Sequence, residues 1–115
     1  MLRSTTSEYD RGIDGHRVEI KFSTLWASGV FKFQQIRDQR YEQLLCLGIE
    51  PLDAHCWVIP KPVLHDHVIG HTGQHTGRSG SDTAWLSFPA ADPPAWIAPF
   101  GGTLAAAWQV LRSLD

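Results

Sequence analysis

The pair Asp14-Gly15 constrains the fold of this chain more than any other feature, because it marks a tight β-hairpin. A two-residue type I′ turn needs positive φ at both central positions, and Asp-Gly is one of the few pairs that accept this. The runs on both sides alternate apolar and polar residues, as strands with one buried face do. The sequence therefore predicts antiparallel strands over about residues 5–13 and 16–24.

The second strand of this hairpin, in the run RVEIKFS, has two unlike faces. Successive side chains of a strand point to opposite sides of the sheet. The apolar face, which we expect to contact the core, consists of Val18, Ile20 and Phe22, and the charged face of Arg17, Glu19, Lys21 and Ser23.

The predicted register of the hairpin brings two carboxylates together. With the turn at residues 14–15, the numbers of directly opposed residues sum to 29, so Asp10 lies opposite Glu19 and Glu8 opposite Lys21. Opposed side chains share a face with Cβ atoms about 4.5–5.5 Å apart, and like charges there repel. A hard cation such as Mg²⁺, which takes oxygen ligands, suits such a pair. Lys21 could then orient an attacking water or offset charge that develops on a phosphate.

This array, Asp10 followed after eight residues by Glu19-x-Lys21, resembles the PD-(D/E)xK nuclease superfamily, which includes restriction endonucleases and Holliday-junction resolvases. The resemblance implies an α/β fold, a restriction endonuclease-like sandwich with a mixed β-sheet and flanking helices. It also implies a metal-dependent, endonuclease-like enzyme that hydrolyses DNA phosphodiester bonds. In that case Asp10, Glu19 and Lys21 are catalytic, and Asp10 and Glu19 bind Mg²⁺ or Mn²⁺. A homodimer is expected for cutting both strands of DNA.

One domain is expected over residues 1–115, which suffice for a single core. Members of the superfamily usually carry a helix and a strand before the Asp strand, whereas nine residues precede Asp10 here. Either the start is trimmed, or Glu8 or a partner subunit takes the place of those elements. The alternative functions are a non-catalytic nucleic-acid-binding module of the same fold and a surface hairpin whose charged face serves solubility.

A helix is predicted over residues 29–47, where the apolar residues of GVFKFQQIRDQRYEQLLCLGI fall on one side at 100° per residue. Gly48 follows as the residue that ends the helix. Arg37 and Arg40 lie within the apolar sector of this helix, from which they reach the acids or a phosphate, or extend to the sheet edge. Similar nucleases carry amides on such a helix, so Gln34 and Gln35 are candidates, with Arg37, for contact with DNA or with water near the metal.

The rest of the chain predicts two strands and two helices. AHCWVIP and TAWLSF are strand-like, PVLHDHVIG begins a short helix at Pro62, and TLAAAWQVLRSL predicts a closing helix. The side chains of Trp85, Trp96 and Trp108 are expected in the core because their contexts are apolar.

Histidines form a second candidate metal site, in which His65, His67, His71 and His75 are spaced H-x-H-x3-H-x3-H and the last three stand at intervals of four. Zinc prefers about four nitrogen or sulfur ligands, and Cys56 or Asp66 could complete such a set. The glycines that follow His67 favour a loop, which could instead lie against a nucleic-acid backbone. A histidine-loop zinc-binding protein is therefore a further alternative.

The charge of the chain is close to neutral, and the sequence predicts no targeting segment. The net charge is −2, but residues 11–40 contain six basic and three acidic side chains, which is compatible with a phosphate-facing patch. The sequence predicts no signal peptide and no membrane span, so we expect a cytoplasmic protein without membrane contact. Cys46 and Cys56 lie in apolar contexts, which favours reduced, buried thiols.

Overall fold

The predicted hairpin is present in the computed structural model, which describes residues 11–13, 16–69 and 83–113. Strand β1 (Arg11–Ile13) pairs antiparallel with strand β2 (His16–Thr24). Arg11 lies opposite Val18 and Ile13 opposite His16, so the residue numbers of the described pairs sum to 29, as the turn predicts. The register of the hairpin is therefore confirmed for the described pairs, while Glu8 and Asp10 lie outside the described residues.

The helix predicted over residues 29–47 is wrong. This segment forms strand β3 (Val30–Arg37) and the first part of strand β4 (Gln43–Glu50), with a turn between them. In β3, Phe31 and Phe33 are buried while Lys32 between them is less so, which is the alternation of a strand. Gln34 and Arg37 lie in β3 and Arg40 follows that strand, so the positions predicted for them on a helix are wrong.

The prediction failed at strand β4 because this strand packs against a hydrophobic cluster on both faces. Leu44 and Cys46 contact one hydrophobic cluster and Leu45 and Leu47 another, so the strand is a continuous apolar run without alternation. Such a run cannot be distinguished from a buried helix by periodicity alone. Gly48 does not end a helix but lies against Phe31, whose ring atoms would be 2.6 Å from an added Cβ.

The remaining elements agree with the sequence in type and approximate position. The short helix begins at Lys61, one residue before Pro62, and Thr103 caps the last helix by accepting a hydrogen bond from the Ala106 amide. These elements are strand β5 (Asp53–Pro60), helix α1 (Lys61–His67), strand β6 (Thr83–Pro89), the 3₁₀ helix η2 (Ala98–Phe100) and helix α2 (Leu104–Arg112).

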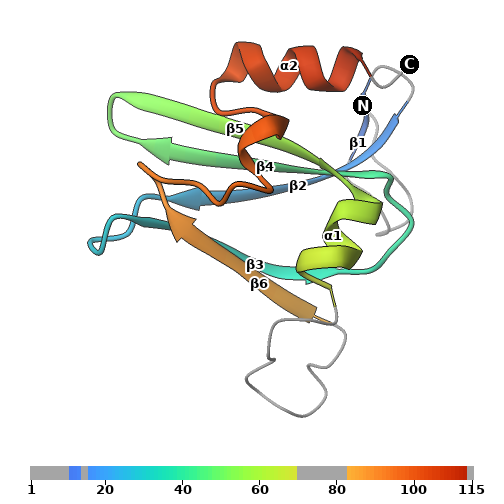
Figure 1. Ribbon diagram of the computed structural model, residues 1–115, viewed down its shortest axis with the longest axis horizontal. Coiled ribbons are helices and arrows are strands. Elements are labelled where there is room, and N and C mark those ends of the chain that lie inside the picture. The colour runs from blue at the N-terminus through green and yellow to red at the C-terminus, as the bar shows by residue number, and fades with distance from the viewer. Residues whose placement is uncertain (1–10, 14–15, 70–82, 114–115) are drawn as a thin grey trace.

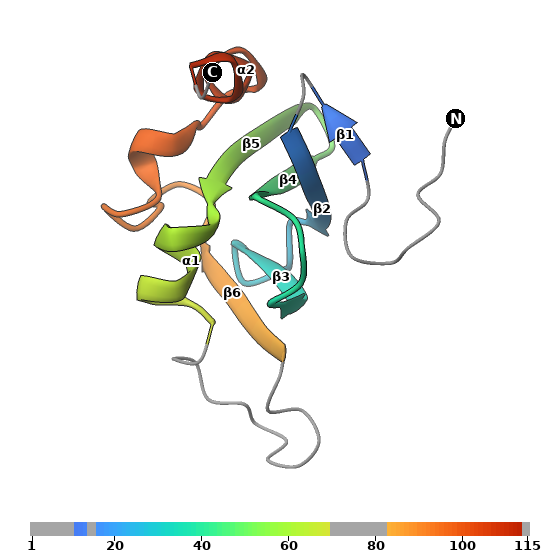
Figure 2. The same cartoon turned by 90° about the vertical axis from the view of Figure 1, so that its right-hand side faces the viewer.

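The strands form two sheets in a small α/β fold (Figure 1). The larger sheet is mixed and has the order β1-β2-β4-β5, in which β2 and β4 run parallel and the other neighbours antiparallel. The smaller sheet contains β3 and β6, paired antiparallel. Helix α2 covers one face of the larger sheet, and the smaller sheet lies on its other side (Figures 1 and 2).

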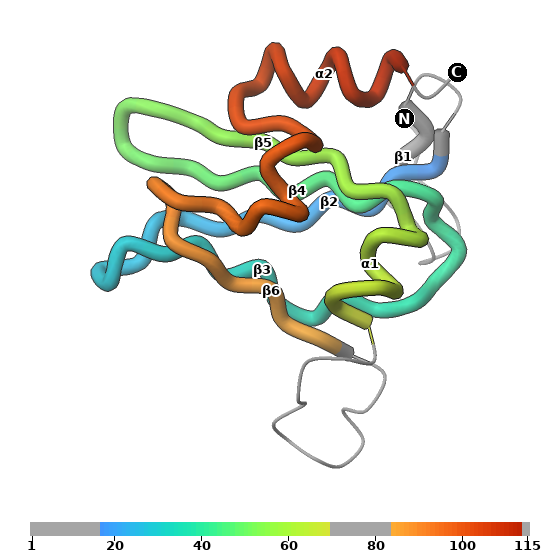
Figure 3. The backbone as a smooth tube through the Cα atoms, viewed as in Figure 1, coloured from blue at the N-terminus to red at the C-terminus, as the bar shows by residue number. Residues whose placement is uncertain are grey.

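Two hydrophobic clusters follow from this layering. The larger cluster fills the space between the two sheets and includes Phe31, Phe33, Trp57 and Ile59. The smaller cluster lies between the larger sheet and α2 and includes Val18. Strands β2 and β3 meet at one side of the layered structure, where the chain passes from the larger sheet to the smaller (Figure 3). We call this junction the β2–β3 seam.

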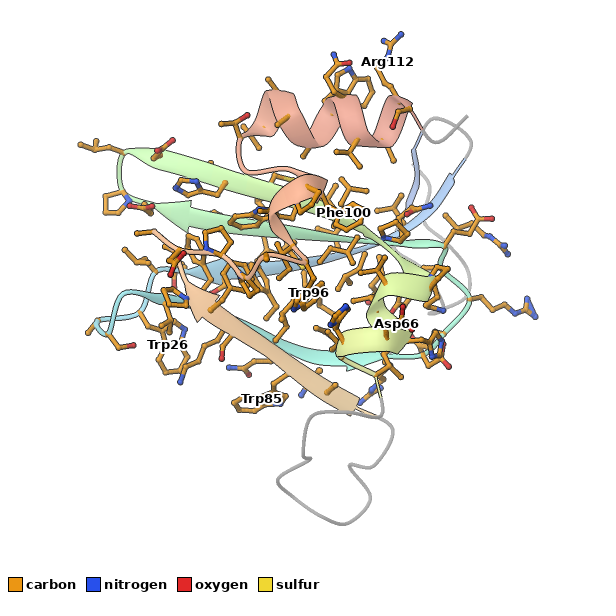
Figure 4. The ribbon with its side chains drawn as sticks, in the orientation of Figure 1. Trp26, Asp66, Trp85, Trp96, Phe100 and Arg112 are labelled. Atoms are coloured by element: carbon orange, nitrogen blue, oxygen red, sulfur yellow. The ribbon has the colours of Figure 1, made fainter. Side chains whose placement is uncertain are left out.

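The tryptophans are divided between core and surface. Trp57 is buried in the larger cluster, and Trp96 is partly buried against it. The prediction that Trp85 and Trp108 belong to the core is wrong, since their exposed fractions are 42% and 46%. Trp85 lies on the outer side of the smaller sheet (Figure 4).

In the part of the chain that the structure describes, no helix has the length and apolar character needed to cross a membrane.

Candidate functional site

Glu19 and Lys21 lie on the face of β2 that is turned toward the smaller sheet. Their neighbours Val18 and Ile20 point the other way, into the cluster beneath α2. Ser23, on the same face as Lys21, accepts a hydrogen bond from the Lys32 amide of β3 at 2.8 Å, which joins the two strands at the seam. The charged face predicted from RVEIKFS is therefore directed into the molecule at these positions.

The two charged side chains are largely shielded from solvent. The side chain of Glu19 is 13% exposed and that of Lys21 is 23% exposed, with Lys21 Nζ at 3.5 Å from Glu19 Oε2. Oε1 of Glu19 is fully buried. Removing a carboxylate and an ammonium from water is costly even when they are paired. A face built for solubility would leave such groups in water, so their burial favours a specific role.

A hollow of about 160 Å³ opens beside this pair, lined by residues from both strands of the seam. Glu19 and Lys21 come from β2, Gln35 and Arg37 from β3, and Gln39 from the turn that follows. The structure thus brings four residues singled out in the sequence, at positions 19, 21, 35 and 37, around one small space.

Gln35 reaches the hollow through an irregularity in β3. The register with β6 shifts between Phe33 and Ile36, so that the segment bulges, and Gln35 has φ of 57°. A non-glycine residue in this left-handed region is uncommon, and bulges are frequent next to active sites, where they redirect side chains. Both Phe33 and Ile36 stay buried across the bulge. The bulge therefore keeps the core intact while Gln35 lines the hollow.

Tyr41 supports the site and was missed by the sequence analysis, which treated it as one more apolar residue of a helix. Its hydroxyl donates a hydrogen bond to the backbone carbonyl of Arg37, where β3 ends. Burial, and secondly the negative charge of Glu19, raise the pKa of Tyr41 well above its usual value. The phenol therefore stays protonated and fixes the backbone that presents Arg37.

Helix α1 anchors the turn that carries Gln39. Lys61 Nζ lies 3.0 Å from Asp38 Oδ1 and also donates to the carbonyl of Gln39, while His65 Nε2 lies 3.3 Å from the same Asp38 oxygen. The hydrogen bond from Lys61 is the main cause that lowers the pKa of Asp38 below its usual value. These contacts hold residues 38–39 beside the hollow without contributing to its chemistry.

Two further hollows each share a lining residue with this one. A larger space of about 710 Å³ shares Gln39 and includes Arg17, Arg40 and Glu42. A third space of about 270 Å³ shares Lys21. Gln34, predicted with Gln35 as an accessory residue, lines this third hollow rather than the one at Glu19.

The described residues give no support to a zinc site at the histidines. The ring of His67 stacks on Trp96, with centroids 4.4 Å apart and planes at 3°. His71 and His75 lie outside the described residues. Within residues 11–13, 16–69 and 83–113, no three His, Cys, Asp or Glu side chains gather closely enough to hold a metal ion.

The cysteines are buried and free, as predicted. Burial raises the pKa of the Cys56 thiol to about 11, and it raises that of Cys46 further. Such thiols are poor metal ligands and poor nucleophiles at neutral pH.

Several residues that line the hollow at Glu19 carry oxygen atoms that suit a hard cation. Glu19 has a carboxylate, and Gln35 and Gln39, which also line this hollow, have amide groups. Carboxylate and amide oxygens are ligand types that Mg²⁺ and Mn²⁺ prefer over nitrogen or sulfur. Asp10, the second predicted carboxylate, lies outside the described residues.

Comparison of the sequence with family models and with curated proteins finds no match.

Proposed function

We propose that this protein is a metal-dependent nuclease of the PD-(D/E)xK type, with a restriction endonuclease-like fold, that hydrolyses phosphodiester bonds of DNA. The observation that carries the proposal is the buried Glu19–Lys21 pair, which is 3.5 Å apart and borders a hollow at the seam of two sheets. An acid and an amine two residues apart on one strand, facing inward beside an open space, form the Glu-x-Lys half of the site that the sequence resemblance implies.

The observed hairpin register supports Asp10 as the other half. The described pairs end at Arg11 and Val18, and their numbers sum to 29. If the same register continued by one step, Asp10 would lie opposite Glu19, as the sequence predicts. Directly opposed side chains share a face of the sheet, so under this proposal both carboxylates border the same hollow.

Two carboxylates and nearby amides would hold Mg²⁺ or Mn²⁺, which when bound would polarise a phosphate oxygen and help to activate water. The residues of the chain contribute the rest. Lys21, next to Glu19, would orient the attacking water and offset negative charge that develops on the phosphate. Arg37 would bind a neighbouring phosphate oxygen, and Gln35 would orient water or the substrate by hydrogen bonding.

The charges around the three hollows favour a phosphate backbone as the ligand. The protein has a net charge of −2 overall, yet the three linked hollows contain more basic than acidic side chains. The acidic residues are Glu19 and Glu42, and the basic residues are Arg17, Lys21, Lys32, Arg37, Arg40 and Lys61. Arg17, Lys21 and Lys61 form ion pairs with Glu42, Glu19 and Asp38, so the excess comes from the other three basic residues. Such a local excess attracts a polyanion even on a molecule that is acidic overall.

The proposal is tested by conversion of supercoiled plasmid to nicked and linear forms in Mg²⁺. We expect cutting by the wild-type protein and a loss of at least about 100-fold in Glu19→Gln and Lys21→Ala, as for removal of groups that stabilise charge in a transition state. Glu50→Gln, the same chemical change at the opposite end of the larger sheet, serves as the matched control and should cut normally.

Three results would speak against the enzyme. Equal cutting by wild type and Glu19→Gln would indicate a contaminating nuclease. Cutting in EDTA would show that the reaction needs no metal ion and would contradict a metal-dependent nuclease. DNA binding by the wild type without any cutting in Mg²⁺ or Mn²⁺ would favour the non-catalytic binding module of the same fold.

A further inference from the structure

The third hollow of the seam combines aromatic and cationic groups at its border. Its volume is about 270 Å³, and it shares Lys21 with the hollow at Glu19. The other residues at its border include Phe22, Thr24, Trp26, Lys32 and Gln34. No acidic side chain borders this hollow in the described part of the chain. Its charge therefore favours an anion.

Two of these side chains are aromatic and exposed. Phe22 is 63% exposed although it lies on the apolar face predicted for β2, and Trp26 is 43% exposed. Phe22 shares its face of β2 with Ile20 rather than with Lys21, so Trp26 is the aromatic ring that this hollow offers to a stacked base. An aromatic surface next to cations is the combination by which proteins hold unpaired bases and their phosphates.

The backbone at Trp26 is held by hydrogen bonds of a turn, and its ring contacts Lys32. Trp26 lies in the turn between β2 and β3, where its amide donates to the Val30 carbonyl at 2.9 Å and its carbonyl accepts from Gly29 at 2.8 Å. Gly29 has φ of 84°, which this turn requires. Lys32 Nζ lies 4.0 Å from the centre of the Trp26 ring. Figure 4 shows Trp26 at the turn, apart from the core.

We infer that this hollow binds one unpaired nucleotide of the DNA strand, next to the phosphate that lies at Glu19 and Lys21. The base stacks on Trp26, the phosphate contacts Lys21 and Lys32, and Thr24 and Gln34 hydrogen-bond to the nucleotide. This inference rests on the proposed function, because it takes the neighbouring hollow as the cutting site.

The inference specifies the substrate class. A base in a duplex is stacked between its neighbours and cannot contact an indole ring unless it leaves the stack, which costs a few kcal/mol. Single-stranded DNA, or a duplex with an unpaired segment, avoids that cost. We therefore expect the protein to bind single-stranded DNA more tightly than a blunt duplex of the same sequence.

The test measures binding in EDTA, where hydrolysis cannot contribute. Fluorescence anisotropy gives the Kd for a labelled single-stranded oligonucleotide and for the matching blunt duplex. Trp26→Ala should weaken single-strand binding about tenfold, as expected for loss of one stacked base, and Trp26→Phe should retain most of the affinity. Trp108→Ala is the matched control, because Trp108 is similarly exposed but lies on α2.

A second variant tests the phosphate contact. Lys32→Gln should reduce the slope of log Kd against log salt concentration by about 0.7, the value for one phosphate contact on a single strand. A slope equal to that of the wild type would show that Lys32 does not contact the backbone. Circular dichroism of each variant verifies that the fold is retained.

The outcomes separate this inference from the proposed function. If Trp26→Ala binds single strands as the wild type does, or if the wild type prefers the duplex, the nucleotide site is overturned even when plasmid is cut. If Trp26→Ala weakens binding but the wild type cuts nothing in Mg²⁺, the nucleotide site stands and the nuclease proposal fails. Absence of DNA binding by the wild type in EDTA overturns the nucleotide site, whereas the nuclease proposal is decided by plasmid cutting in Mg²⁺.

Discussion

Lys21 Nζ lies 3.5 Å from Glu19 Oε2 on the inward face of β2, where both side chains are mostly shielded from solvent. The ladder with β4 continues along this strand, placing Glu19 beside Leu44 and Lys21 beside Cys46. An ion pair therefore occupies two positions that neighbour core residues of the adjacent strand.

This arrangement predicts strong coupling between Glu19 and Lys21 in stability. Lys21→Met leaves the carboxylate in a poorly solvated place and should lower the free energy of unfolding by about 1–3 kcal/mol. Glu19→Gln in the same chain should recover part of the loss, because it removes the charge. Urea denaturation of the two single variants and the double variant gives the coupling free energy, and additive effects would contradict this account.

The bulge at Gln35 predicts a conflict between stability and activity. Gln35→Gly should raise the free energy of unfolding by about 0.5–1 kcal/mol, because glycine adopts the φ of 57° without the steric cost of a side chain. The same change removes the amide from the hollow and should lower plasmid cutting. Gln34→Gly, where φ is not positive, is the control and should destabilise the strand. A fall in stability of Gln35→Gly would show that the amide itself holds the bulge.

Gly48 predicts a steric effect at the centre of the larger sheet. In Gly48→Ala the new methyl group would lie 2.6 Å from ring atoms of Phe31, so that the ring must move within a packed core. We expect a loss of about 1–3 kcal/mol, measured by urea denaturation. Phe31→Leu in the same chain provides space and should make Gly48→Ala less costly than it is alone. If the urea midpoint of Gly48→Ala equals that of the wild type, the Phe31 ring moves aside at little cost and this account is contradicted.

Tyr41 predicts a specific loss of stability at high pH. Its folded pKa is raised, mainly by burial, above an unfolded value of about 10. Above that pH the unfolded chain releases the phenol proton while the folded chain retains it, so stability falls as pH rises. Tyr41→Phe should be less stable at neutral pH by about 1 kcal/mol, through loss of the hydrogen bond to Arg37, and less sensitive to pH between 9 and 11. Parallel pH profiles of the two proteins would contradict the assignment.

The sequence correctly predicted those features of the candidate site that lie within the hairpin. The positions of Glu19 and Lys21 on one face follow from the alternation of a single strand, and the register follows from the turn at Asp14-Gly15. Gln35 and Arg37 were named for another reason, as polar residues of a helix that does not exist. Their position beside Glu19 depends on β3 returning along β2, which no local pattern indicates.

The sequence by itself determined the hairpin, the strand that ends at Pro60, the short helix at Pro62 and the closing helix capped by Thr103, because turn pairs, prolines and caps act on their nearest neighbours. Only the tertiary structure decided that residues 30–50 form two strands, since β4 is apolar on both faces and its burial comes from α2 on one side and the smaller sheet on the other. The same layering turned Glu19 and Lys21 inward and opened a hollow beside them. A strand that packs on both faces lacks the alternation of polar and apolar residues by which a strand is predicted. Its structure is therefore decided by contacts with distant segments.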